Sequence, residues 1–356
     1  MRCLVRTYGA GAHVARFPVE LVRGDVLDRA SVEEAARGCD VVYHCATGTS
    51  WILRERRRVE VDGTRNVLGA ALESGARVVQ LSSVLVYGVT SDGDLDESAP
   101  RGKTGDLYAD SKLAAEHLAA EHASRLPVTI LQPTAVYGPW AGVYGTSILR
   151  MLRTSRVPLV DGGSGICNVV YVDDLVTAML AAASREEAVG ETFLITGSDH
   201  VTWRSFYERF SRMLGVTGRT VDMSLDDVVR RWRRSGWKRP GLVGEVFRTL
   251  QEGRLRDRLY DTREGAAAMR VAQAVLPPSV FHARIAKGSS RAIRQGDVAR
   301  EPPLVLLRPF TARFQATRTH VRIDKARSLL GYEPAFDFET GTGLTERWAH
   351  WAGLLG

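Results

Sequence analysis

A tyrosine and a lysine four residues apart carry the strongest chemical signal in this sequence. Tyr108 and Lys112 lie in the segment YADSK. Residues at positions i and i+4 of a helix share one face, so a phenol and an ammonium with this spacing can lie side by side. A neighbouring cation favours the phenolate form of a phenol, which suits it to act as a general acid or base. The pair therefore indicates proton transfer at a bound substrate.

Hydroxyl side chains follow an apolar run just upstream of this pair. The run VVQL ends in Ser82 and Ser83, and a second apolar run ends in Gln132, Pro133 and Thr134. In open α/β sheets, ligands bind at the carboxyl ends of the strands. A hydroxyl at that edge can hold a substrate oxygen while the tyrosine exchanges its proton.

The elements that must position these residues alternate between strands and helices over the first 200 residues. The expected strands are Arg2–Arg6, Val19–Arg23, Val41–His44, Val78–Ser83, Val128–Gln132 and Glu191–Ile195. The expected helices are Ser31–Gly38, Val61–Glu73 and Asp110–Ser124. This alternation is typical of parallel βαβ units. We therefore predict an α/β fold with a doubly wound parallel sheet.

The pattern changes after residue 139 to glycine-rich loops and a long basic, amphipathic stretch that prolines interrupt. The remaining expected elements are a strand at Asn168–Val172 and helices at Asp174–Ala183, Ile323–Gly331 and Gly343–Trp351. We expect a smaller, mainly helical C-terminal substrate lobe formed by 139–168 with 201–356. The cofactor-type domain would then comprise 1–138 with 169–200.

The composition is that of an ordinary soluble globular protein. The chain has 356 residues, of which 44% are hydrophobic and 25% are charged, and its length suggests two domains. Its four cysteines show no CxxC pairing, so we expect reduced thiols, no disulfide framework and no metal site. It contains no membrane-spanning run and no signal-peptide pattern, which makes the cytoplasm the default location.

The net charge of +7 belongs to one segment of the chain. Residues 221–320 contain 20 basic and 10 acidic residues, so the rest of the chain carries a small negative charge. We interpret this basic insert as an arginine-rich solvated surface and expect no nucleic-acid partner and no integral membrane association. Peripheral contact with a membrane, or with an acidic substrate, through 221–320 stays open.

The motifs in this order resemble the extended short-chain dehydrogenases/reductases, also called the NAD-dependent epimerase/dehydratase family. The resemblance covers nearly the whole chain and implies a Rossmann-like domain, NAD or NADP as cofactor, a small-molecule substrate and a homodimer. Besides the serine motif and YxxxK, the matching segments are Gly24–Val26, His44–Ala46, Gly63–Asn66, Val172–Asp174 and Lys325–Pro334.

The resemblance also assigns roles to individual residues. Tyr108 would be the proton donor or acceptor, Lys112 would hydrogen-bond the nicotinamide ribose, and Ser83 would orient the substrate oxygen. The remaining cofactor contacts would be Asp25 and Val26 at the adenine, and Ala46, Pro133 and Thr134 along the cofactor path. Arg6 would end the family's second strand, where a cation can accommodate the 2′-phosphate of NADP.

The start of the chain departs from the family pattern. Members begin with a strand and a GxxGxxG turn that receives the pyrophosphate, and this sequence has neither. We therefore read Arg2–Arg6 as the second strand of the family and expect a truncated gene model that lacks about 25–30 residues upstream. The missing strand would leave its two neighbours unpaired.

Other departures narrow the reaction. Val84 and Leu85 replace the acidic pair of the nucleotide-sugar dehydratases, and Cys167 stands where many epimerases carry an arginine for the diphosphate. Glu60 and Gln132 likewise stand where an asparagine and an arginine are common. These changes favour a ketone/alcohol reductase similar to the 3β-hydroxysteroid or dihydroflavonol reductases. A nucleotide-sugar epimerase with bound NAD, and a binding or scaffold homologue without the cofactor turn, are the alternatives.

Overall fold

The computed structural model describes residues 1–9, 11–48, 53–235 and 301–355. The chain divides into two compact units, Met1–Val229 with Pro303–Gly356, and Arg230–Pro302. Most of the second unit lies outside the described residues, and with it most of the expected basic insert 221–320. The fold below is that of the first unit.

The strands form one four-stranded sheet and several two-stranded ones. The larger sheet has the order β10-β6-β4-β3, and all of its strands are parallel. The pairs β1-β2, β11-β8, β12-β5 and β7-β9 are parallel as well. The strands are β1 (Arg2–Val5), β2 (Glu20–Arg23), β3 (Val41–His44), β4 (Arg77–Leu81), β5 (Gly93–Leu95), β6 (Val128–Pro133), β7 (Ala135–Tyr137), β8 (Val157–Val160), β9 (Val169–Tyr171), β10 (Thr192–Ile195), β11 (Thr220–Met223) and β12 (Thr319–Val321).

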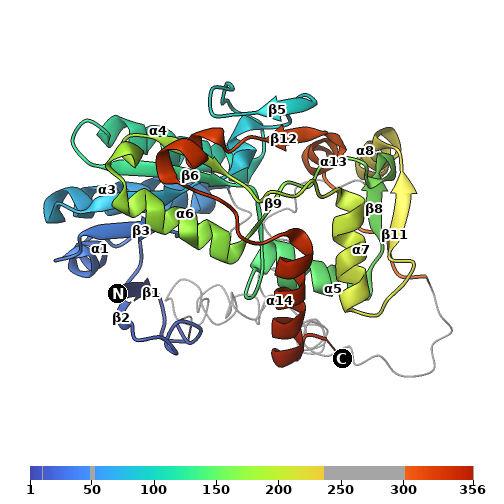
Figure 1. Cartoon of the computed structure of the whole chain (residues 1–356), viewed down its shortest axis with the longest axis horizontal. Coiled ribbons are helices and arrows are strands. Elements are labelled where there is room, and N and C mark those ends of the chain that lie inside the picture. The colour runs from blue at the N-terminus through green and yellow to red at the C-terminus, as the bar shows by residue number, and fades with distance from the viewer. Residues whose placement is uncertain (10, 49–52, 236–300, 356) are drawn as a thin grey trace, which may run out of the picture. The chain divides into compact units, whose positions relative to one another are not determined.

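The helices alternate with these strands as the sequence predicts (Figure 1). The α-helices are α1 (Arg29–Ala36), α2 (Leu53–Arg57), α3 (Gly63–Ser74), α4 (Leu107–His122), α5 (Ser147–Thr154), α6 (Val172–Ser184), α7 (Trp203–Met213), α8 (Leu225–Arg234), α13 (Pro309–Ala316) and α14 (Phe338–Trp351). The short 3-10 and π turns are η1 (Arg58–Asp62), η2 (Val84–Tyr87), η3 (Gly142–Thr146), η4 (Asp161–Gly163), η5 (Glu186–Ala188) and η6 (Ala326–Leu330).

Helices cover both faces of the four-stranded sheet because successive strand residues point to opposite sides. In β4, Val78 packs with Leu68 of α3 and Leu118 of α4, whereas its neighbour Val79 packs with Leu175 of α6. All of these side chains are buried. This arrangement is the doubly wound, Rossmann-like sheet that the sequence predicts.

The pair β1-β2 forms a sheet of its own. Within the described residues, β1 hydrogen-bonds as a strand only to β2, and β3 pairs only with β4. Val26, just after β2, still packs against α3, because Asn66 Nδ2 donates to its carbonyl at 2.8 Å.

Two helices begin earlier than the sequence suggested, and both begin at an aspartate cap. The range Asp110–Ser124 was wrong at its start, since α4 begins at Leu107, where the Asp106 carboxylate accepts hydrogen bonds from the first free N–H groups. The terminal helix begins at Phe338 instead of Gly343, because Asp337 Oδ1 accepts from Thr340 N at 2.7 Å. Side-chain acceptors at these positions satisfy amides that have no partner within the helix.

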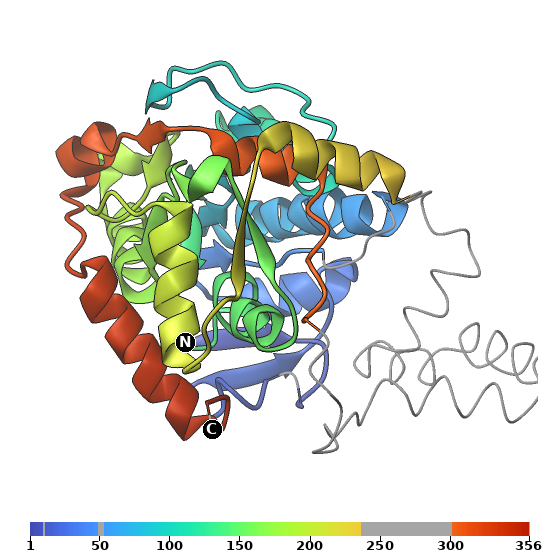
Figure 2. The ribbon, with the colours of Figure 1, turned by 90° about the vertical axis from the view of Figure 1, so that its right-hand side faces the viewer.

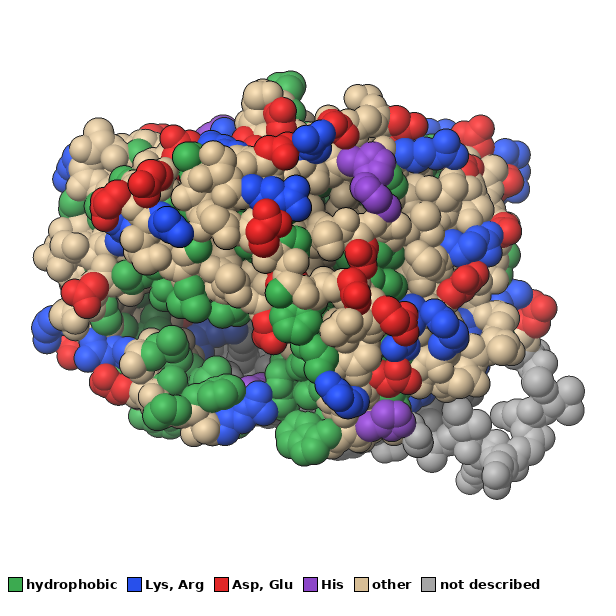
Figure 3. Space-filling view, viewed as in Figure 1, with side chains coloured by type: hydrophobic (Ala, Val, Ile, Leu, Met, Phe, Trp, Pro, Cys, Tyr) green, Lys and Arg blue, Asp and Glu red, His purple; other side chains and the backbone are tan. Residues whose placement is uncertain are grey.

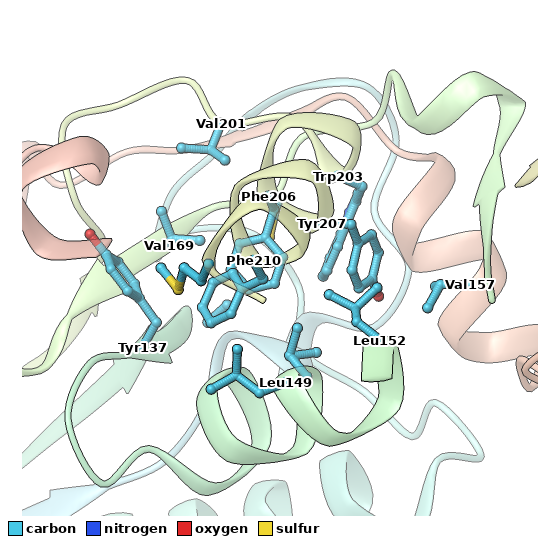
Figure 4. Packing of buried hydrophobic residues seen from close by; sticks show 14 of the residues in the cluster. Tyr137, Leu149, Leu152, Val157, Val169, Val201, Trp203, Phe206, Tyr207 and Phe210 are labelled. Atoms are coloured by element: carbon cyan, nitrogen blue, oxygen red, sulfur yellow. The ribbon is translucent and has the colours of Figure 1, made fainter. Parts of the chain in front are cut away.

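The lobe beyond the sheet has its own aromatic core, which α5, α7 and α14 enclose (Figure 2). Phe206 of α7 is fully buried among Phe210, Tyr207 and Leu152 (Figure 4). Arg209 of α7 also pairs with Glu346 of α14 at 2.9 Å. The surface over this unit carries acidic and basic side chains interspersed, without a block of one sign on the face that Figure 3 shows.

Candidate active site

The carboxyl ends of neighbouring strands bring most of the expected site residues to one edge of the four-stranded sheet. Ala46 lies two residues after β3, Ser83 two residues after β4, and Thr134 directly after Pro133, the last residue of β6. These strands are adjacent and parallel, so their carboxyl ends lie together. Ligands of open α/β sheets bind at this edge.

Tyr108 and Lys112 lie one turn apart on α4, which packs beside this edge. Asp106 Oδ1 accepts from the Tyr108 N–H at 3.0 Å, so the cap of α4 places the tyrosine in the first helical turn. The Lys112 ammonium donates to the Leu81 carbonyl at 3.1 Å, at the last residue of β4. The lysine therefore ties the helix to the strand end that leads into Ser83.

Ser83 begins the 3-10 turn η2 and is buried at the strand end. Its hydroxyl oxygen accepts from Leu85 N at 3.2 Å, which leaves its own O–H free to donate to a bound oxygen. The neighbouring Ser82 hydroxyl is buried and has no hydrogen-bond partner among the described residues. An unpartnered buried hydroxyl costs free energy unless a ligand supplies the missing bond.

Two arginines that the sequence did not indicate lie close to Tyr108. The Arg56 guanidinium lies 5.6 Å from the centre of the Tyr108 ring, within cation–π range. Burial lowers the pKa of Arg56, and the charges of Glu60 and Tyr108 oppose that shift. Arg308, near the end of the basic insert, pairs with the capping Asp106 at 3.1 Å. No local pattern in the sequence links either arginine to the tyrosine.

Glu60 joins Lys112 to the loop after β3. Its carboxylate lies 3.1 Å from the Lys112 ammonium, and it accepts from Thr47 Oγ1 at 2.5 Å and from Gly48 N at 2.9 Å. Both members of the ion pair are buried, with exposures of 1% for Glu60 and 5% for Lys112. In the sequence, Glu60 differs from the family pattern only in replacing an asparagine, which does not indicate these contacts.

A buried histidine lies behind this ion pair. His44 Nε2 is 2.9 Å from Thr64 Oγ1, and that hydroxyl donates to the Glu60 carbonyl at 2.5 Å. Since the hydroxyl proton is used in this way, the histidine must be the donor, with hydrogen on Nε2. Burial, and secondarily the charge of Lys112, lower the pKa of His44 to about 4.

This shift predicts a loss of stability in mild acid. The unfolded chain protonates His44 below about pH 6.5, whereas the folded chain keeps it neutral down to about pH 4, so the stabilisation is complete above pH 6.5 and falls as the pH drops toward 4. At pH 4.5 the loss from this group is about 2–3 kcal/mol. Urea unfolding between pH 7.5 and 4.5 should therefore give a shallower pH dependence for His44→Gln than for the parent chain. Equal slopes would show that another group titrates.

The expected adenine-contacting residues lie apart from this cluster, near the β1-β2 pair. Arg6 directly follows β1 and is exposed, and Asp25 lies two residues after β2 with one carboxylate oxygen accepting from Leu27 N at 3.0 Å. Because β1 and β2 are parallel, Arg6 and Asp25 share the carboxyl edge of that pair. Val26 is the residue that links this edge to α3.

Two residues that depart from the family pattern, Cys167 and Gln132, have buried side chains. Cys167, where an arginine would grip a diphosphate, is 1% exposed in the lobe core, and burial raises the pKa of its thiol. Gln132 accepts from the Tyr87 hydroxyl at 2.8 Å and donates to Glu116 at 2.9 Å. Both side chains are engaged within the protein and contribute no cation to the edge.

The comparison with known families agrees with this geometry. The sequence model of the NAD dependent epimerase/dehydratase family matches residues 2–196, which is more than half of the chain. The chain belongs to this family. Members of this family are NAD-dependent oxidoreductases, epimerases and dehydratases. The chain is therefore an enzyme of this family type, and its cofactor is NAD or NADP.

Relatives within the epimerase/dehydratase family include reductases and dehydrogenases. A 4-hydroxy-2-methyl-3-oxo-4-farnesyl-3,4-dihydroquinoline-1-oxide ketoreductase from Stigmatella aurantiaca is 30% identical over 224 residues, 61% of this chain and 66% of that relative, which is just under two thirds. A decarboxylating sterol-4-alpha-carboxylate 3-dehydrogenase from Candida albicans is 24% identical over 347 residues, 93% of this chain and 83% of the relative. A solved epimerase from Methanothermobacter thermautotrophicus superposes with a TM-score of 0.67 at 18% identity, covering 99% of this chain and 86% of that one, and it shares the fold.

The residues at the sheet edge fit the nicotinamide end of the cofactor. The Lys112 ammonium has a third N–H besides the two directed at Leu81 and Glu60, and the buried Ser82 hydroxyl has no partner among the described residues. Donors for a ligand are therefore present.

The described residues contain no group of three or more acidic, histidine or cysteine side chains arranged to hold a metal ion. None of the described helices is long and apolar enough to cross a membrane.

Proposed function

We propose that this chain is an NAD(P)-dependent oxidoreductase that acts on a ketone or secondary alcohol of a small molecule, with Ser83, Tyr108 and Lys112 as its catalytic residues. The observation that carries the proposal is the placement of Tyr108 and Lys112 on one face of α4, with the lysine bonded to the strand end two residues before Ser83. A phenol, a cation and a hydroxyl at a ligand-binding edge suit proton exchange with a carbonyl or carbinol oxygen.

The roles follow from what each group can donate or accept. The bound nicotinamide supplies or takes up the hydride. The Ser83 hydroxyl orients the substrate oxygen, and the Tyr108 hydroxyl gives that oxygen a proton or removes one. Lys112, one helical turn from Tyr108, would hold the nicotinamide ribose. The cofactor's remaining contacts would come from Ala46, Pro133 and Thr134 on its path, from Asp25 and Val26 at the adenine, and from Arg6 at a 2′-phosphate.

The residues that differ from the family pattern favour a ketone or alcohol as the substrate over a nucleotide sugar. The buried Cys167 supplies no cation for a diphosphate, and Val84 and Leu85 supply no acidic pair for dehydration. The relative that matches at 30% identity is named a ketoreductase. Epimerisation of a nucleotide sugar is the second candidate, because Arg308 reaches Asp106 beside Tyr108 and could replace the lost arginine.

Cofactor consumption distinguishes these reactions. The chain is incubated with NADH or NADPH and a panel of ketones that includes 9,10-phenanthrenequinone, and absorbance at 340 nm is followed. We expect stoichiometric oxidation of the cofactor with at least one ketone. Interconversion of UDP-glucose and UDP-galactose with no net change at 340 nm would replace this proposal by the epimerase. Absence of NAD and NADP binding in titration calorimetry would favour a scaffold role.

A further inference from the structure

Glu60 is a buried carboxylate whose partners belong to three different parts of the site. It lies in the π turn η1 between α2 and α3, and it contacts Lys112 of α4 and the loop residues Thr47 and Gly48 after β3. One oxygen accepts the two loop donors, and the other faces the ammonium. Both carboxylate oxygens therefore have partners, and these partners hold the carboxylate from two sides.

These contacts determine which way Lys112 can point. An ammonium has three N–H bonds. Two of them are directed to Leu81 O and to Glu60 Oε2, each at 3.1 Å, on the strand side and the η1 side. Among the described residues Lys112 has no other polar contact, so its third N–H is the one left for a ligand or for the phenolate. With two directions occupied, the third is set by geometry.

The charge of Glu60 matters as much as its shape. An ammonium out of water is costly unless a carboxylate accompanies it, and removing one partner of a buried pair leaves the other uncompensated. An asparagine at this position could accept the loop hydrogen bonds but would offer no charge to Lys112. The ion pair also couples the lysine to the loop that begins at Ala46, on the expected cofactor path.

We propose that Glu60 is a positioning residue that holds the Lys112 ammonium by an ion pair and aims its remaining N–H at the cofactor ribose and Tyr108. The inference rests on the proposed function, because it acts on the reaction only through Lys112. It assigns a role to a residue that has no contact with the reacting atoms.

The first test measures the reduction of 9,10-phenanthrenequinone by Glu60→Gln, Glu60→Asp and Lys112→Met variants of the full chain. Glu60→Gln should lower kcat roughly 10- to 100-fold with little change in KM for the quinone, because its amide turns an N–H toward the ammonium. Glu60→Asp keeps the charge and should recover most of that loss. In the Lys112→Met background, Glu60→Gln should change kcat by less than about 2-fold, since its effect passes through the lysine.

Glu116→Gln is the matched control for this test. Glu116 is a buried glutamate of α4 whose carboxylate pairs with Arg101 at 2.9 Å and accepts from Gln132 at 2.9 Å, and does not pair with the Lys112 ammonium. Its replacement also removes the charge of a buried glutamate from an ion pair, yet it should leave kcat within about 3-fold of the parent. Multiplicative losses from Glu60→Gln and Lys112→Met, or an equal loss from Glu116→Gln, would overturn the positioning role.

Thermal unfolding separates this proposal from the proposed function. Glu60→Gln and Lys112→Met should each lower the unfolding midpoint by several degrees, and the double variant should recover much of the loss because neither charge is left alone. Additive losses would contradict the coupling of Glu60 to Lys112. If the parent chain reduces no ketone while the midpoints still show this coupling, the proposed function fails and the positioning of Lys112 by Glu60 stands.

Discussion

Replacing Tyr108 by phenylalanine is expected to lower turnover roughly 100- to 10,000-fold, the range that a general acid or base contributes. The change removes only the hydroxyl that exchanges the proton. The ring stays beneath the Arg56 guanidinium, and the backbone N–H of residue 108 still donates to Asp106, so α4 keeps its start. Lys112 also keeps its bonds to Leu81 and Glu60. Cofactor affinity should therefore change little.

The measurement compares kcat for a reduced ketone with cofactor affinity from the quenching of tryptophan fluorescence. Tyr87→Phe is the matched control, because Tyr87 is a buried tyrosine near the same sheet edge whose hydroxyl donates to Gln132. It should keep kcat within about 3-fold of the parent. Turnover by the Tyr108→Phe variant at the parent rate would remove Tyr108 from the mechanism.

The sequence predicted the sheet, and it placed Ser83, Tyr108 and Lys112 at one edge of it, because both predictions rest on local patterns. Runs such as VVQL alternate their side chains between two faces, and the structure places Val78 and Val79 on opposite sides of the sheet. The i, i+4 spacing of Tyr108 and Lys112 needed only a helix, and α4 supplies it. The start of that helix was missed because Asp106 acts as a cap through its side chain, which hydrophobic periodicity does not report.

The electrostatic surroundings of the tyrosine could not be predicted in the same way. Glu60, Arg56 and Arg308 reach the site from η1, α2 and the segment before α13. Each contact depends on how separate elements pack, and no spacing in the sequence encodes it. Glu60 could be noticed only as a departure from an asparagine. Its role could be inferred only from the 3.1 Å distance between its carboxylate and the Lys112 ammonium and from the burial of both side chains.

Replacing Phe206 by alanine is expected to lower the free energy of unfolding by about 3–5 kcal/mol, the usual cost of deleting a buried phenylalanine ring. The side chain is fully buried, and its ring centre lies 4.8 Å from that of Phe210 and 6.0 Å from that of Phe338 in α14 (Figure 4). Of these rings, Figure 4 labels Phe206 and Phe210. Urea unfolding at neutral pH measures the loss. Phe17→Ala, which truncates a half-exposed ring, should cost about 1 kcal/mol or less.

We also expect Phe206→Ala to weaken substrate binding at the proposed site, because Phe206 packs near Tyr144. The ring centre of Tyr144 lies 6.2 Å from that of Phe206, and burial raises the pKa of Tyr144 above its usual range. Tyr144 lies in η3, which packs against β7, the strand that follows Thr134 at the sheet edge. Loss of the Phe206 ring frees Tyr144 to shift, whereas Tyr108 and Lys112 remain fixed on α4. We therefore expect the folded Phe206→Ala protein to show a raised KM for the ketone with a nearly unchanged kcat, and a loss confined to kcat would contradict this coupling.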